Sequence, residues 1–172
     1  MQIPRIEDIK GIDGEIILTA QQVKKFEDDY KITADMQKTC GQIIFGIIKN
    51  KGMEKNTKFG IDVRKIVDLT GLNDKIIYLL KNPDCALNKQ MVVSFAIGLE
   101  LDVHATAYLL AANGMVFNTN NKVDKAYVYL IEQHKGRNIE DCNIILGKLG
   151  IAKKYFLGSQ ERGEYNTSKD DD

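Results

Sequence analysis

The chain has 172 residues, of which 44% are hydrophobic and 28% charged, and its 24 Lys and Arg residues balance 24 Asp and Glu residues. This length and composition are those of one globular domain that is large enough to bury a core. The sequence has no apolar run of about 18 residues, so we expect no membrane span. It has no apolar N-terminal stretch as long as that of a secretory signal peptide, so we expect no secretion through such a peptide. Its three cysteines are widely spaced and match neither a disulfide framework nor a zinc site, which favours a cytoplasmic protein.

The balanced charge is distributed unevenly along the chain. Residues 1–36 hold five bases and eight acids, whereas residues 37–90 hold ten bases and five acids. Residues 91–121 contain two acids and no Lys or Arg, and residues 122–172 hold nine of each sign. A basic block inside a neutral protein indicates a face that could meet a polyanion. A lysine-rich solvated surface produces the same pattern, so both interpretations stay open.

Residues 1–33 are predicted to form a small N-terminal appendage. A short extended stretch is expected at 15–18, after the turn-like residues 13–14. Thr19 and Gln22 have the spacing of a capping box, which predicts a helix after Thr19. Three apolar residues would share one face of that helix, namely Val23, Phe26 and Tyr30.

From about Thr33 onward the pattern predicts a series of short helices. The first predicted helix stops before Gly52 and contains six apolar residues at helical spacing: Met36, Cys40, Ile43, Ile44, Ile47 and Ile48. Further helices are expected at 62–69, 73–81, 88–101, 103–112, 122–133 and 139–149, the last with Asn138 as N-cap and Gly150 after its C-terminus. The chain is therefore predicted to be all-α, with Cys40 in its core. Residues 158–172 have little apolar content and are expected to form a disordered tail.

The segment 62–81 has the pattern of a helix-turn-helix. Gly71 stands at the turn, where the chain needs a positive φ that Gly adopts at little cost. Apolar and small residues on both sides of it have the spacing of two crossed helices that bury a shared wedge: Ile66, Thr70, Leu72, Ile77 and Leu80.

The flanking sequence resembles bacterial and phage proteins of the XRE/Cro-C1 (lambda-repressor-like) helix-turn-helix group. In that group an Asn- or Ser-capped helix with an Ala-Ile-x-Leu-Glu-Leu core precedes a helix that ends Leu-Leu-x-x-x-Gly, as in residues 86–117 here. In that group a Val-Asp pair and then a last helix come next. Their counterparts here are Val123 and Asp124, and residues 138–141 at the start of the last predicted helix. The resemblance covers residues 37–151.

The resemblance implies a five-helix core at 34–115, a C-terminal helical extension at 116–157, and a sequence-specific regulator, repressor-like, that binds double-stranded DNA as a homodimer without a cofactor. Asn73 could read adenine, Tyr78 could reach a phosphate or a thymine methyl group, and lysines suit phosphates. The residues expected to contact DNA are Arg64, Lys65, Asn73, Asp74, Lys75, Tyr78, Lys81, Asn82 and Asn88. The dimer interface is expected in the N-terminal appendage or on the two C-terminal helices, at Tyr127, Tyr129, Leu130, Ile144 and Leu149.

A second interpretation is a degenerate helix-turn-helix that binds a protein, such as an antitoxin-like or anti-defence factor. The second helix of the pair, 73–81, would be the recognition helix. It has no Arg, the residue that makes the commonest contact to guanine. Leu79 stands where the group often has Lys or Arg, and Val67 replaces a small residue. Ile76 and Leu79 would then offer an apolar surface to a protein partner.

Catalysis and metal binding find little support in the sequence. His104 and His134 are far apart and have no carboxylate or cysteine at ligand spacing. Cys85 has no neighbouring base to activate it. Gly11 and Gly14 lack the lysine and the further glycine of a phosphate loop. We therefore expect no catalytic residue, no metal site and no enzyme activity.

Overall fold

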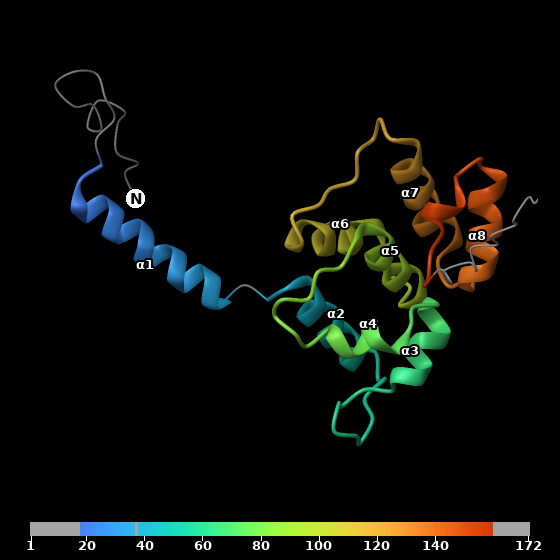
Figure 1. Cartoon of the computed structure of the whole chain (residues 1–172), viewed down its shortest axis with the longest axis horizontal. Coiled ribbons are helices and arrows are strands. Elements are labelled where there is room, and N and C mark those ends of the chain that lie inside the picture. Colours follow the sequence, from blue (N-terminus) through green and yellow to red (C-terminus); the bar gives the residue numbers. More distant parts are fainter. Residues whose placement is uncertain (1–17, 37, 160–172) are drawn as a thin grey trace, which may run out of the picture. The chain divides into compact units, whose positions relative to one another are not determined.

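The computed structural model describes residues 18–36 and 38–159 of an all-α protein (Figure 1). These residues contain eight α-helices, a short 3₁₀ turn at Lys153–Tyr155, and one isolated antiparallel bridge between Glu54 and Ile61. The predicted fold class is thereby confirmed at the level of its secondary structure. The chain divides into two compact units, residues 1–37 and 38–172. No helix in the described part is long and apolar enough to cross a membrane.

The N-terminal unit contains helix α1, Ala20–Met36. The predicted capping box is present, since Gln22 N donates to Thr19 Oγ1 at 3.2 Å and Thr19 N donates to Gln22 Oε1 at 2.8 Å. Val23 and Phe26 are exposed. The predicted boundary after residue 33 falls inside α1. The side chain of Tyr30 and the predicted extended stretch, apart from the exposed Leu18, lie outside the described residues.

The second unit begins with α2, Cys40–Asn50. A second capping box, formed by Thr39 and Gln42, starts this helix after α1 has ended at Met36. Met36 and Ile48 therefore belong to two different helices. The sequence pattern predicts a single helix for both residues, and that prediction is wrong because Thr39, a polar N-cap, starts a new helix between them. Cys40 is buried as predicted.

The remaining helices follow the predicted order with small shifts at their ends. They are α3 (Val63–Thr70), α4 (Asp74–Leu79), α5 (Lys89–Gly98), α6 (Val103–Ala112), α7 (Lys122–His134) and α8 (Ile139–Lys148). Each begins after an Asp or Asn whose side chain accepts a backbone N–H of the first turn: Asp62, Asn73, Asn88, Asp102, Asn121 and Asn138. Such caps satisfy N–H groups that have no partner inside the helix.

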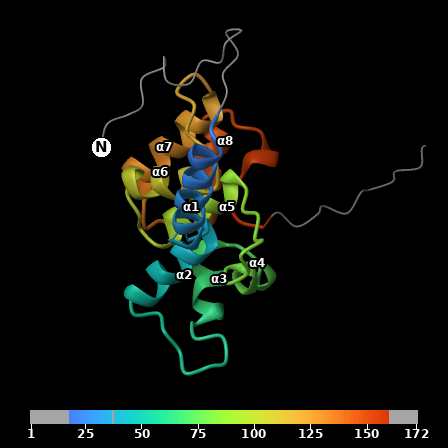
Figure 2. The same cartoon turned by 90° about the vertical axis from the view of Figure 1, so that its left-hand side faces the viewer.

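Helix α5 is the centre of the second unit. Six consecutive residues, Val92 to Ile97, are buried, so α5 has almost no solvent face. It packs against α3, α6, α7 and α8. Figure 2 shows α2, α3 and α4 below α5 and α7 and α8 above it, while α6 lies beside α5 and also packs against α2. The segments predicted as a core, 34–115, and as an extension, 116–157, thus share one hydrophobic core.

The end of α5 is fixed by close contact with α3. A Cβ atom on Gly98 would lie 2.6 Å from the carbonyl oxygen of Leu69 and 2.9 Å from Cγ2 of Thr70. Glu100 then adopts a φ of 56°, which ends the helix three residues before the predicted end at 101. The sequence did not indicate this end, because Glu is not a residue that favours a left-handed conformation.

A buried ion pair joins α5 to α7. Lys89 Nζ lies 2.8 Å from Asp124 Oδ2, whose residue is 5% exposed. Asp124 Oδ2 also accepts the N–H of Asn118 at 2.6 Å, and Lys89 Nζ donates to the carbonyl of Val116 at 2.8 Å. The pair therefore fastens the connection between α6 and α7 to the start of α5.

The last described segment, residues 153–159, returns across α5 to the turn between α3 and α4. Tyr127 Oη donates to the carbonyl of Tyr155 at 2.6 Å, and Gly158 N donates to Ser94 Oγ at 2.9 Å. Ser159 N donates to the carbonyl of Gly71 at 2.7 Å. Gly158 and Ser159 are thus held in place, which corrects the prediction that the disordered tail begins at 158. Residues 160–172 of that predicted tail lie outside the described residues.

The contact at Gly98 leads to a test of the packing. Gly98→Ala should lower the free energy of unfolding by about 1–3 kcal/mol, because the added methyl group meets the backbone of Leu69 and the buried side chain of Thr70. Gly46→Ala is the matched control: it also lies inside a helix, but nothing lies within 4 Å of an added Cβ. It should raise the free energy of unfolding by about 0.5–1 kcal/mol. Urea unfolding of both variants measures the difference, and equal values would contradict this account.

Candidate nucleic-acid interface

Helices α3 and α4 are joined by a tight turn at residues 71–73. Gly71 has a φ of 65°, as its place in the sequence predicted, and its N–H donates to the carbonyl of Val67. Thr70 Oγ1 donates to the carbonyl of Ile66 at 2.7 Å and accepts the N–H of Leu72 at 3.3 Å. The five predicted wedge residues are all buried: Ile66, Thr70, Leu72, Ile77 and Leu80.

The nine residues predicted to contact DNA are all solvent-exposed. They lie in the first turn of α3, along α4 and its C-terminal turn, and at the start of α5: Arg64, Lys65, Asn73, Asp74, Lys75, Tyr78, Lys81, Asn82 and Asn88. The structure therefore leaves each side chain accessible, while the opposite side of α4 contributes Ile77 to the core.

The three asparagines of this set already have structural roles. Asn73 Oδ1 accepts the N–H of Ile76 at 3.1 Å, and Asn88 Oδ1 accepts the N–H of Met91 at 2.9 Å. Asn82 Oδ1 accepts the N–H of Asp84 at 2.9 Å. Bidentate reading of adenine uses both the oxygen and the nitrogen of an amide. Asn73 thus has its oxygen engaged as an N-cap and offers its Nδ2 group to a ligand.

Lys81 and Tyr78 belong to an aromatic cluster that the sequence analysis missed. Lys81 Nζ lies 4.8 Å from the ring centroids of both Phe45 and Phe59. The two rings meet edge to face with centroids 5.5 Å apart, and Phe59 meets Tyr78 in the same way at 5.0 Å. Aromatic rings attract a cation over their faces. The cluster therefore positions both Lys81 and Tyr78 at the surface.

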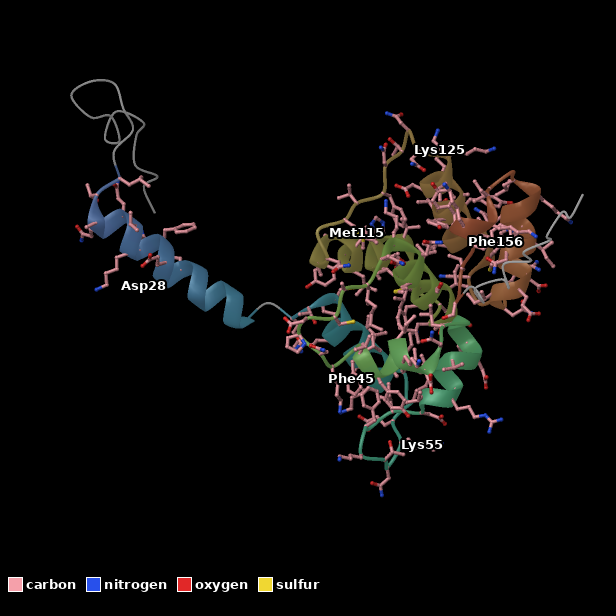
Figure 3. The ribbon with its side chains drawn as sticks, in the orientation of Figure 1. Asp28, Phe45, Lys55, Met115, Lys125 and Phe156 are labelled. Atoms are coloured by element: carbon pink, nitrogen blue, oxygen red, sulfur yellow. The ribbon has the colours of Figure 1, made fainter. Side chains whose placement is uncertain are left out.

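A groove of about 640 Å³ lies beside this cluster. One wall is the loop between α2 and α3, and the other is formed by α4 and the first turn of α3. Figure 3 shows that loop at Lys55, with Phe45 nearby. The groove is lined by Lys55, Thr57, Lys58, Phe59, Ile61, Asp62, Val63, Arg64, Tyr78 and Lys81.

The groove carries an excess of positive charge. Asp62 is paired with Lys55 at 3.4 Å, and Glu54 at the edge of the loop is paired with Lys49 at 3.3 Å. A hydrogen bond from the backbone of Lys65, together with Lys55, lowers the pKa of Asp62. Within the described part of the chain, Lys58, Arg64 and Lys81 have no carboxylate partner at ion-pair distance. Three cations therefore remain to meet an anion.

The apolar residues of α4 on which the protein-binding interpretation depends differ in exposure. Leu79 is 47% exposed, whereas Ile76 is half-buried and packs against the core. Leu79 is thus the apolar side chain that α4 presents beside Tyr78.

Two residues predicted for a dimer interface are unavailable for it. Tyr127 and Leu130 are 1% and 0% exposed, because the face of α7 on which they lie packs into the core of the same chain. Tyr129, Ile144 and Leu149 remain exposed. A second hollow of about 210 Å³ brings Tyr129 of α7 together with Leu149 and Ile151 at the end of α8.

The three cysteines are free thiols. Burial raises the pKa of the Cys40 and Cys142 thiols to about 11, so both are protonated at neutral pH. Burial also raises the pKa of Cys85. No group of three His, Cys, Asp or Glu side chains that could hold a metal ion is found in residues 18–36 and 38–159.

The loop at 51–62 contains the site residues that sequence reasoning missed. Phe59, Lys55 and Lys58 stand in the polar stretch between the helix predicted to stop before Gly52 and the helix predicted at 62–69. The available signal was an aromatic residue among lysines, because such a residue in a loop either packs or binds a ligand. Phe45 carried no such signal, since it lies among the apolar residues of α2.

Comparisons with protein-family models, curated protein sequences and solved structures give no match to this chain.

Proposed function

We propose that this chain is a sequence-specific DNA-binding protein, a repressor-like transcription regulator in which α4 lies in the major groove of duplex DNA. In this proposal α2 to α6 form a lambda-repressor-like core, and α7 and α8 form a C-terminal extension. One observation carries it: the pair α3 and α4 buries all five wedge residues and leaves all nine proposed contact residues on accessible surface.

Six of the nine residues have a stated role in the proposal. Lys75 and Lys81 on and after α4 bind phosphates, and Arg64 and Lys65 bind the backbone from the first turn of α3. Tyr78, 52% exposed, reaches a phosphate or a thymine methyl group. Asn73 offers its Nδ2 group to a base edge or a phosphate, because its oxygen caps α4.

A second candidate function is protein binding through the same helix. The observation that favours it is Leu79, which is 47% exposed beside the exposed ring of Tyr78. An apolar side chain of this kind suits the desolvated centre of a protein interface better than a wet and polar DNA interface.

Binding to random duplex DNA should weaken steeply with salt. The four proposed phosphate contacts, Arg64, Lys65, Lys75 and Lys81, predict a slope of about −3 to −4 per chain when log affinity is plotted against log salt. Fluorescence anisotropy of a labelled duplex at several salt concentrations measures this slope. A folded protein that binds no duplex even at low salt would leave protein binding as the function of α4.

Three substitutions on α4 and its cap separate the two candidate functions. Asn73→Ser keeps an oxygen that can cap the helix but removes the amide, and it should cost ~1–3 kcal/mol on a site selected from random duplexes. Lys75→Ala should weaken all sequences alike and make the salt slope shallower by about one. Leu79→Ala should then matter least.

If α4 binds a protein, the order of the three effects reverses. Leu79 becomes an anchor whose loss costs ~2 kcal/mol or more, and Lys75 lies on a tolerant rim. Thermal melts of each variant show whether the fold is intact. The DNA proposal would be overturned if Asn73→Ser and Lys75→Ala had no effect on binding while Leu79→Ala abolished function.

The proposed regulator acts as a dimer, because proteins of this kind read two half-sites about one helical turn apart through a two-fold axis. The exposed residues left for the interface on α7 and α8 are Tyr129, Ile144 and Leu149. Sedimentation at micromolar concentration should show a dimer, and Ile144→Glu or Leu149→Glu should shift it toward the monomer. A strict monomer both with and without DNA would contradict this part of the proposal.

A further inference from the structure

We propose that the groove between the 51–62 loop and α4 is a binding site for an unpaired nucleotide of a nucleic-acid strand, with the base on the Tyr78 ring and the phosphates on Lys58, Arg64 and Lys81. The inference extends the proposed function, because Tyr78 and Lys81 belong to both surfaces. It adds a different form of nucleic acid, since a base inside a duplex has both of its faces stacked and cannot lie on a side-chain ring.

The first step of the argument is the chemistry of the walls. The lining of the groove combines apolar groups, among them Phe59, Ile61 and the ring of Tyr78, with cations. A purely phosphate-binding surface needs no apolar lining, and a purely apolar partner needs no cations. A nucleotide carries both a flat aromatic base and an anionic phosphate, and proteins that bind single strands combine stacking rings with a basic groove.

The second step is the way in which the stacking ring is held. Tyr78 is 52% exposed, and its ring meets the ring of Phe59 at an interplanar angle of 68° with centroids 5.0 Å apart. An edge-to-face contact with one neighbour can cover at most one face of the Tyr78 ring, and half of the residue stays exposed. The pair therefore presents Tyr78 as a preformed platform, which reduces the entropy lost when a base stacks on it.

The third step is the placement of the cations. Phe45 and Phe59 hold Lys81 Nζ at 4.8 Å from each ring centroid, so Lys81 is fixed beside the platform. Arg64 from α3 and Lys58 from the loop line the same groove, and neither has a carboxylate partner among the described residues. The two acids of the 51–62 loop, Glu54 and Asp62, are already paired with Lys49 and Lys55. The excess positive charge is therefore available to a phosphodiester.

The fourth step is size. The volume of about 640 Å³ lies within the ~300–1,000 Å³ of typical small-molecule sites, so the groove can hold a base, its sugar and a phosphate.

The test uses the full chain and labelled DNA oligonucleotides of equal length, of which the two single strands also carry equal charge. One is an ordinary single strand, the second has abasic residues in place of its central nucleotides, and the third is a blunt duplex. We expect the abasic strand to bind at least about fivefold more weakly than the ordinary strand, the change that ~1 kcal/mol of lost stacking produces. Equal affinity for the two single strands would overturn the inference, because phosphate contacts alone would then explain the binding.

Variants locate the effect in the groove. Tyr78→Leu should weaken binding of the ordinary strand by about fivefold or more and leave the abasic strand unchanged, whereas Tyr78→Phe keeps the ring and should preserve both affinities. Lys58→Ala should weaken both strands. The matched control is Lys125→Ala, an exposed lysine on α7 that Figure 3 shows far from the loop at Lys55. An equal loss in Lys58→Ala and Lys125→Ala would contradict a local site.

The outcomes also separate this inference from the proposed function. A blunt duplex that binds tightly while the abasic change has no effect supports the duplex regulator and overturns the nucleotide site. A strong abasic effect without duplex binding supports the nucleotide site and overturns the duplex regulator.

Discussion

The enclosure of helix α5 is the constraint on which the rest of the second unit depends. Because Val92 to Ile97 are buried on every side, each neighbouring helix must pack against α5, and no neighbour can move without exposing apolar surface. The approach to α3 is closest at Gly98, where a side chain would strike the backbone of Leu69. The charged end of α5 is tied to α7 by Lys89 and Asp124. Helix α5 thus fixes the position of α3 from one side.

Helix α4 is held at both of its ends by further contacts. Gly41 of α2 lies so close to Leu80 that a Cβ would be 2.7 Å from its carbonyl oxygen. Asn73 N donates to Ser159 Oγ at 2.7 Å, so the returning C-terminal segment supports the start of α4. A six-residue helix has little stability of its own and takes its orientation from such contacts. The result is a rigid α4 whose outer face carries Lys75, Tyr78 and Leu79.

The sequence predicted the parts of this arrangement that local chemistry determines. Gly71, the Asn138 cap and the wedge around Ile77 were all predicted, because positive φ, capping and helical periodicity act over a few residues. Three other features could not be predicted, because each joins residues that are distant in sequence. They are the end of α5 at Gly98, the Lys89–Asp124 pair and the return of Ser159 to Gly71. The candidate site divides in the same way: the residues of α4 were found from the pattern, whereas Phe45 and Phe59 join them only through the fold.

The most direct measurement is a ¹H–¹⁵N NMR titration of the full chain with a short duplex at low salt, because it reports every backbone amide separately. If the exposed face of α4 is the nucleic-acid interface, the largest shifts fall at residues 73–82 and in the groove at 55–65, while the buried centre of α5 is nearly unchanged. Shifts that are absent at 73–82, or that are largest on the exposed face of α7 and α8, would contradict the account.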